Sequence, residues 1–157
     1  LLSSLLNKVR NKYDIEVYIE PGEAIALNAG FLLAKVEDIV TSQNEKTAVL
    51  NVSFAAHMPD CLEMPYKPEV VGETNKGFEF TLGGNTCMSG DFVRGFHFEK
   101  ELQVGQDIIF KDMGHYTFVK TTFFNGVKHP SLGIWAKNNE FRLLKDFSYE
   151  DFKHRLS

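Results

Sequence analysis

The chain has 157 residues and a formal net charge of −4, with 43% hydrophobic and 24% charged residues, which fits one soluble packed domain. Its Lys and Arg residues are scattered, and no apolar run approaches the roughly 20 residues of a membrane helix, so we expect neither nucleic acid nor membrane as a partner. Two cysteines outside any CxxC pair fit a reducing cytoplasm and support neither a disulfide framework nor structural zinc, and the start of the chain lacks a secretory signal pattern.

The N-terminal part predicts a helix followed by two strands. Apolar residues recur every three to four positions over residues 1–13, with cations late in the segment, which predicts a helix that begins without a cap, as if cut from a longer chain. A short strand is expected over Glu16–Glu20, ended by a Pro-Gly turn, and a second, straight or bent, over Ala24–Ile39. This order is typical of the closing unit of a larger α/β domain.

From Thr47 onward the pattern is one of short strands separated by Gly, Pro and Asn. This spacing predicts an antiparallel sheet or barrel. The predicted strands cover residues 47–54, 77–82, 91–98, 107–110 and 115–124. In the tail, Ser148 at an N-cap with Asp151 three residues later predicts a short terminal helix over 148–156.

Two segments combine a turn with reactive side chains. Glu20-Pro-Gly-Glu23 places two carboxylates at a predicted strand end, where a carboxylate could pair with a cationic ring nitrogen or an ammonium group; the alternative is a solvated turn. Cys87 lies in a Gly-rich polar loop. An exposed thiol there could shuttle a proton or act as a nucleophile, whereas most free cysteines are buried and inert.

Two further segments carry candidate binding residues. Tyr116, in a predicted strand entered through a Gly turn, could donate a hydrogen bond to a phosphate or could be a half-buried packing residue. A loop fixed by two prolines carries His57, Asp60 and Glu63 and could bind a cation. Because the spacing of these three residues matches no metal signature, we expect no metal.

Read in order, EPGEAIALNAG, HMPDCLEMPY, GGNTCMSGD and DMGHYTFVKTTFFNG resemble the C-terminal signatures of the fold-type III, alanine-racemase-like pyridoxal-phosphate-dependent decarboxylases. This class includes the ornithine, diaminopimelate and arginine decarboxylases. Within it, HMPD-x-LEMPY and HYT-x-VKTT-x-FNG are similar to the branch that acts on carboxynorspermidine and carboxyspermidine in polyamine biosynthesis. The alternatives are a diaminopimelate or arginine decarboxylase, or a non-catalytic regulatory homologue.

The resemblance implies a fold that is mainly β. Residues 1–30 would be the remnant of the last α/β unit of a cofactor-binding β/α barrel, and residues 31–157 a C-terminal, Greek-key-like antiparallel β-barrel or sandwich domain. The rest of the barrel, with the Schiff-base lysine, would lie upstream of Leu1. Two complete chains would form a head-to-tail homodimer with shared active sites, and this portion alone would be inactive.

The resemblance also implies cofactor and catalytic residues. Glu20, Gly22 and Tyr116 would bind pyridoxal 5'-phosphate, with Glu20 keeping the pyridine nitrogen protonated and Tyr116 bonded to the phosphate. Cys87, reaching in from the neighbouring subunit, would return a proton to the α-carbon after decarboxylation. The residue after this cysteine is not acidic, unlike in several relatives, so Asp91 is expected to serve the dimer interface.

Four residues are implied in substrate binding: Glu23, His57, Asp60 and Glu63. The charge of Asp60 and Glu63 suits the amino groups of a polyamine carboxylate. Many relatives carry an arginine near the phosphate where this chain has Glu23. That difference puts the phosphate contacts in doubt and frees Glu23 to meet substrate amines.

Overall fold

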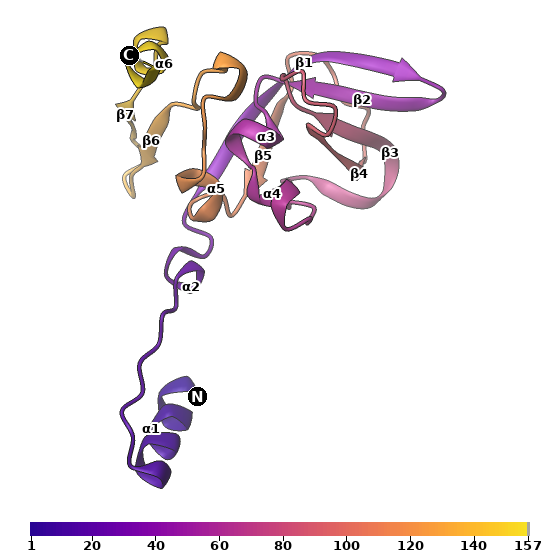
Figure 1. Cartoon of the computed structure of the whole chain (residues 1–157). Helices are drawn as coiled ribbons and strands as arrows, with labels where there is room; N and C mark the ends of the chain where they lie inside the picture. Colours follow the sequence, from indigo (N-terminus) through magenta and orange to yellow (C-terminus); the bar gives the residue numbers. More distant parts are fainter. Residues whose placement is uncertain (157) are drawn as a thin grey trace.

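The computed structural model describes residues 1–156 and is organised around one five-stranded sheet (Figure 1). In chain order the elements are α1 (Leu2–Tyr13), α2 (Glu23–Ala26), β1 (Phe31–Ser42), β2 (Glu45–Leu50), α3 (Phe54–His57), α4 (Asp60–Glu63), β3 (Glu73–Gly83), β4 (Phe92–Phe98), β5 (Asp107–Lys111), α5 (Tyr116–Val119), the 3-10 turn η1 (Phe124–Gly126), β6 (Leu132–Trp135), β7 (Phe141–Lys145) and α6 (Tyr149–Leu156). The sheet order is β4-β3-β2-β1-β5, and β6 and β7 form a separate hairpin.

The sheet is antiparallel except between β2 and β3, which run parallel over Thr47–Val49 and Thr81–Gly83. Parallel neighbours cannot be joined by a tight turn, so the chain crosses over through residues 51–72, which carry α3 and α4. Among the described residues no ladder joins β4 to β5, so the sheet is open rather than a barrel closed by strand pairing.

Aromatic side chains fill the core between the sheet and the crossover. Phe54, Phe80, Phe96 and Phe110 are fully buried, and the rings of Phe54 and Phe110 meet edge to face with centroids 5.7 Å apart. Burying one such side chain stabilises the fold by roughly 1.5–3 kcal/mol. Because the rings come from the crossover and three strands, the core fixes α3 against the sheet.

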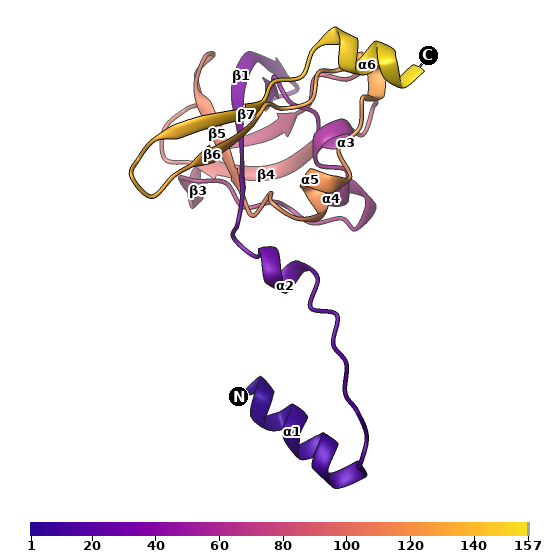
Figure 2. The ribbon, with the colours of Figure 1, turned by 90° about the vertical axis from the view of Figure 1, so that its left-hand side faces the viewer.

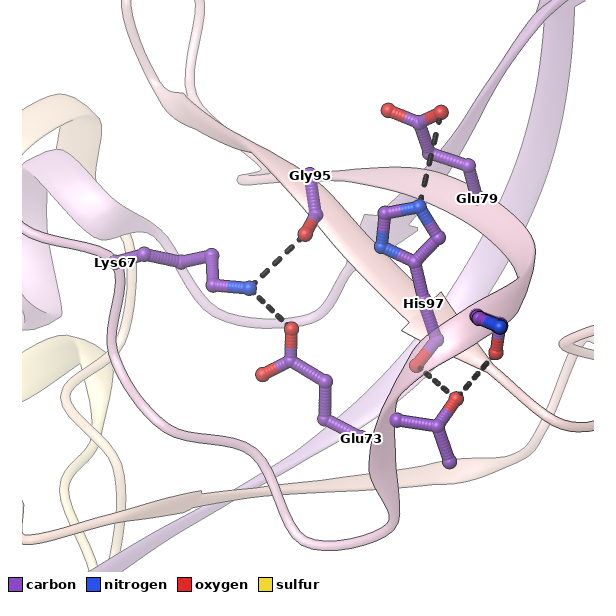
Figure 3. A network of polar contacts seen from close by, with 7 residues as sticks. Lys67, Glu73, Glu79, Gly95 and His97 are labelled. Atoms are coloured by element: carbon purple, nitrogen blue, oxygen red, sulfur yellow. Dashed lines mark hydrogen bonds and ion pairs between the residues drawn. The ribbon is translucent and has the colours of Figure 1, made fainter.

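The crossover is also tied to the edge of the sheet by a lysine (Figure 3). The ammonium group of Lys67 donates to the carbonyl oxygen of Gly95 at 2.9 Å and pairs with the Glu73 carboxylate. Near this point the β3–β4 register shifts around Gly77, whose φ is +123°. A Cβ on Gly77 would lie 2.2 Å from the carbonyl oxygen of Phe98, so only glycine fits there.

The N-terminal arm, residues 1–30, extends away from the sheet (Figures 1 and 2). Helix α1 forms as predicted and ends at Asp14, but none of its residues is buried. The predicted strand over Glu16–Glu20 was wrong, because no described segment lies beside it to complete a ladder. The second predicted strand begins only at Phe31, after the short helix α2. No described helix has the length and apolar character needed to cross a bilayer.

Three of the strands predicted later in the chain are confirmed as β3, β4 and β5, with small shifts at their ends. The first predicted strand, 47–54, stops at Leu50 because Ser53 caps α3, its Oγ accepting from the N–H of Ala56 at 2.9 Å. The terminal helix is confirmed: Asp151 Oδ2 accepts from the N–H of Ser148 at 2.8 Å, the reciprocal bond of a capping box.

The strand predicted over residues 115–124 was wrong, because that segment folds as α5 and η1. His115 starts α5 by accepting the N–H of Tyr116 on its imidazole at 2.8 Å. The N–H of Thr122 then bonds to Ala56 in the crossover rather than to a strand. As a result, Tyr116 lies on a helix that faces the crossover.

Candidate functional site

A cavity of about 990 Å³ lies where the α2 segment, the crossover and the β5–α5 loop meet. Three residues implicated by the sequence, Glu23, Asp60 and Tyr116, line it together. The charged residues of its wall are the carboxylates of Glu23, Asp60, Glu69 and Asp112 and the ammonium groups of Lys67, Lys111 and Lys120. The acidic side chains therefore exceed the lysines in the wall by one.

The turn after Glu20 lies against the Tyr116 hydroxyl. Gly22 has a φ of +42°, in the left-handed region that favours glycine, and a Cβ built on it would lie 3.9 Å from Tyr116 Oη. Glu20 itself is exposed and lines neither described cavity. The structure thus brings Gly22 and Tyr116 together and leaves the Glu20 carboxylate free on the arm.

The two acidic residues of the crossover, Asp60 and Glu63, form ion pairs with Lys120 of the same chain. Lys120 Nζ lies 2.6 Å from Asp60 Oδ1 and 2.7 Å from Glu63 Oε2, and it stands 5.5 Å from the centre of the Tyr116 ring. The hydrogen bonds to Asp60 and then to Glu63 raise the pKa of Lys120. Sequence reasoning missed this lysine, although it belongs to the same HYT-x-VKTT motif as Tyr116.

A second polar cluster lies beside Tyr116. Asp112 Oδ1 accepts from the N–H of Asn28 at 2.6 Å, and Asp112 Oδ2 lies 3.2 Å from His115 Nε2. The hydrogen bond from the N–H of Asn28, and then the nearby imidazole of His115, lower the pKa of Asp112.

One ligand atom each of Glu23, Asp112 and His115 lie within 4.8 Å of one another, as in a metal site. However, His115 Nδ1 accepts the N–H of Tyr116, so the proton of the neutral ring is on Nε2. Since Nε2 would have to lose this proton to coordinate a metal ion, this tautomer argues against a metal ion there.

The Cys87 loop is held by Asp91. Asp91 Oδ1 accepts from the N–H of Ala55 at 2.9 Å, and Oδ2 accepts from the Thr86 hydroxyl at 2.5 Å and from its N–H at 3.2 Å. Asp91 is only 4% exposed, so the expectation that it serves the dimer interface was wrong: its carboxylate is used up inside the chain. Cys87 is exposed, and its sulfur accepts a hydrogen bond from the amide of Asn125. It lines neither cavity.

His57 is separated from Asp60 and lines a second cavity of about 290 Å³ with Thr117 and His129. It is 2% exposed, and its Nδ1 accepts the N–H of Ser53 at 3.1 Å. Burial, with His129 nearby, lowers the pKa of His57 to about 4. The imidazole is therefore a neutral, buried group that does not face the larger cavity.

Comparison with known proteins agrees with the resemblance seen in the sequence. The family model described as "Pyridoxal-dependent decarboxylase, C-terminal sheet domain" matches residues 11–114. The chain is 50% identical over 145 residues to carboxyaminopropylagmatine decarboxylase of Synechocystis sp., covering 90% of this chain and 38% of that protein. It is 40% identical to the carboxynorspermidine/carboxyspermidine decarboxylase of Campylobacter jejuni, covering 98% of this chain and 44% of that protein.

The crystal structure of carboxynorspermidine decarboxylase complexed with norspermidine, from Campylobacter jejuni, superposes with a TM-score of 0.87 at 37% identity, over 97% of this chain and 45% of that one. The chain therefore belongs to the pyridoxal-dependent decarboxylases and has the fold of their C-terminal sheet domain. It spans less than half the length of these relatives. The mainly β, fold-type III prediction is confirmed.

Proposed function

We propose that the chain is the C-terminal portion of a decarboxylase that converts carboxynorspermidine or carboxyspermidine into norspermidine or spermidine. The observation that carries this proposal is the meeting of the Gly22 turn and the Tyr116 hydroxyl at the edge of a cavity that also contains Asp60. In this family these segments are the ones implied in cofactor and substrate binding. The relatives at 40% and 35% identity bear the name of this activity.

Pyridoxal phosphate fits the residues present. When bound, it supplies an electron sink for the charge left on the α-carbon as carbon dioxide leaves. Tyr116 Oη, on the cavity wall, would donate to the phosphate, and the free carboxylate of Glu20 would hold a proton on the pyridine nitrogen. Gly22 would let the backbone approach without a side chain in the way.

The substrate carries ammonium groups, and the cavity wall is acidic overall. We propose that Asp60 and Glu63 receive one of these groups, with Lys120 sharing or yielding its place, and that Glu23 on the opposite segment receives another. The placement of His57 in the second cavity does not support direct substrate contact. We therefore propose an indirect role, in which His57 accepts the N–H of Ser53 and holds the start of the crossover in place.

The proposed assembly is a homodimer in the cytoplasm. Many apolar side chains are exposed along the arm and on the outer face of β1, including those of Ile25, Leu27, Phe31 and Leu33. A monomer seldom leaves so much apolar surface open, so we propose that the N-terminal barrel and a second subunit cover it. Cys87 would then return a proton to the α-carbon in the partner's site. Two free cysteines suit a reducing compartment.

A second candidate substrate is carboxyaminopropylagmatine, because the relative named for it is 50% identical to this chain over the 145 residues that align. Agmatine ends in a guanidinium group, and a planar guanidinium can bind a carboxylate through two parallel hydrogen bonds. Asp60 and Glu63 would offer that contact once Lys120 is displaced.

The test is release of carbon dioxide by the full-length purified protein from each candidate acid: carboxynorspermidine, carboxyspermidine, carboxyaminopropylagmatine, diaminopimelate and arginine. We expect the first two to give the highest kcat/KM. We also expect Glu20→Gln to reduce kcat by at least about 100-fold, whereas Glu16→Gln, an exposed carboxylate on the same arm, leaves it unchanged. Preference for the third acid would select the second candidate, and no release from any would leave the non-catalytic homologue.

A further inference from the structure

We propose that Asp112 and His115 are positioning residues that hold Tyr116 at a fixed place against the Gly22 turn and thereby set how tightly the cofactor phosphate binds. The inference rests on the proposed function. It adds two residues that act through Tyr116 and do not themselves touch the cofactor.

Two contacts, which we call the clasp, hold Tyr116: one joins Asn28 to Asp112, and the other joins Asp112 to Tyr116 through His115. The first of them links the arm to the β5–α5 loop. Asp112 Oδ1 accepts the N–H of Asn28 at 2.6 Å. Asp112 and Asn28 have φ values of 57° and 58°, the left-handed conformation that most side chains avoid. Such backbone persists when surrounding contacts over-determine it, and here the two left-handed residues hold each other.

The second contact joins Asp112 to Tyr116 through an imidazole. His115 Nδ1 accepts the N–H of Tyr116 at 2.8 Å, which leaves Nε2 as the donor of the neutral ring. Nε2 is buried without a well-aligned hydrogen bond among residues 1–156, and its nearest carboxylate oxygen is Asp112 Oδ2 at 3.2 Å. The side chain of His115 is only 10% exposed, and it lies between Asp112 and Tyr116 at the wall of the cavity.

A close backbone contact also joins the arm to the β5–α5 loop. A Cβ on Gly30 would lie 2.7 Å from the Cα of Gly114, and the N–H of Met113 donates to the carbonyl of Gly30 at 2.8 Å. The arm and the loop therefore cross with no side chain between them. Asp112 immediately precedes Met113 at this crossing, so loss of its carboxylate removes the side-chain bond that adds to these backbone contacts in holding the loop that carries Tyr116.

The expected effect follows from hydrogen-bond geometry. A hydroxyl donor is effective only within about 2.5–3.0 Å of its acceptor, and a misplacement of about 1 Å can cost 100-fold in rate. If Asp112 acts by placing Tyr116 Oη, its removal matters only while that hydroxyl is present. This dependence separates a positioning role from a general contribution to folding.

The experiment is a double-mutant cycle on the full-length protein, with the dissociation constant of pyridoxal 5'-phosphate measured by absorbance or fluorescence titration. We expect Tyr116→Phe and Asp112→Ala each to weaken binding about tenfold, and the double variant to bind no more than about twofold worse than Tyr116→Phe alone. Asp112→Asn, which keeps an acceptor for Asn28 but offers no anion to His115, should lie between. Asp107→Asn, on the strand β5 that precedes Asp112 and in a surface pair with Lys35, is the matched control and should bind as wild type.

Independent, multiplying losses in the double variant, or unchanged binding in Asp112→Ala, would overturn the proposal while leaving the proposed function intact. Failure of the wild-type protein to bind the cofactor at all would instead overturn the proposed function. His115→Phe supplies a second readout, because it removes both ring nitrogens without changing the Asn28 bond, and it should weaken binding as Asp112→Asn does.

Discussion

The side-chain amide of Asn125 donates a hydrogen bond of 3.1 Å to the sulfur of Cys87. Cys87 lies in the β3–β4 loop and Asn125 in η1, where it adopts a left-handed φ of 58°. A sulfur that accepts from this amide directs its own hydrogen away from Asn125. The contact therefore fixes the orientation of the Cys87 thiol.

We expect Asn125→Ala to slow alkylation of Cys87 by iodoacetamide at neutral pH by about threefold to tenfold, because the sulfur loses the hydrogen bond that fixes its orientation. The measurement is peptide-level mass spectrometry of the intact protein over time. Buried Cys61 serves as an internal reference that stays unlabelled. An alkylation rate equal to wild type would show that the amide does not act on the sulfur.

Removing Lys120 should make the acid pair more available to substrate. In Lys120→Met, Asp60 and Glu63 lose the ammonium group that they share, so we expect KM for carboxynorspermidine to fall about fivefold, with a stronger dependence on salt. Lys111→Met is the control, since Lys111 lines the same cavity but pairs with Glu69. A raised KM in Lys120→Met would mean that the lysine assists substrate binding.

Asp91 should be important for stability rather than assembly. Asp91→Ala leaves the N–H groups of Ala55 and Thr86 without their acceptor in a buried setting, so we expect a loss of about 3 kcal/mol in the free energy of unfolding. Urea denaturation measures this loss. Glu79→Ala, an exposed acid on β3, should change stability by less than about 0.5 kcal/mol. Dissociation of the dimer with unchanged stability would restore the interface role.

The buried His57 predicts loss of stability in acid. Its pKa is about 4 in the folded chain against 6.5 as its ordinary value, so as pH falls through this window the unfolded chain binds the proton first. Stability is therefore lost between about pH 6.5 and pH 4, with about 2 kcal/mol lost from pH 7 to pH 5. Unfolding should become less pH-dependent in His57→Asn, whose amide oxygen can still accept the Ser53 N–H, but not in His154→Asn on the exposed α6. Parallel pH profiles for wild type and His57→Asn would contradict the assignment.

Elements that are bounded by their own turn or cap residues could be predicted from the sequence. Strands β3 to β5 lie between glycine-containing turns, β5 alternates buried and less buried residues, and α6 has a reciprocal cap, so local signals suffice. Residues 115–124 are rich in β-branched and aromatic side chains, yet the cap at His115 starts the helix α5 and the bond from Thr122 to the crossover takes the place of a strand ladder. Tertiary contacts there override propensity.

The candidate site, like the fold, could be predicted only in part from the sequence. Glu23, Asp60 and Tyr116 do share one cavity, because the motifs that suggested them lie on segments that the fold brings together. Lys120 and Asp112 were missed, since their roles depend on partners far away in sequence that no local spacing reveals. The division of the chain at residue 30 stays a prediction, next to the start of β1 at Phe31.

The parallel pairing of β2 with β3 has a consequence for the crossover. Two neighbouring parallel strands require a connection that runs from one end of the sheet back to the other, and residues 51–72 form that connection. The return path is where Asp60 and Glu63 are placed. The side chains of this segment can therefore change without altering the register of the strand pairs on either side, because the topology requires only that some connection be present.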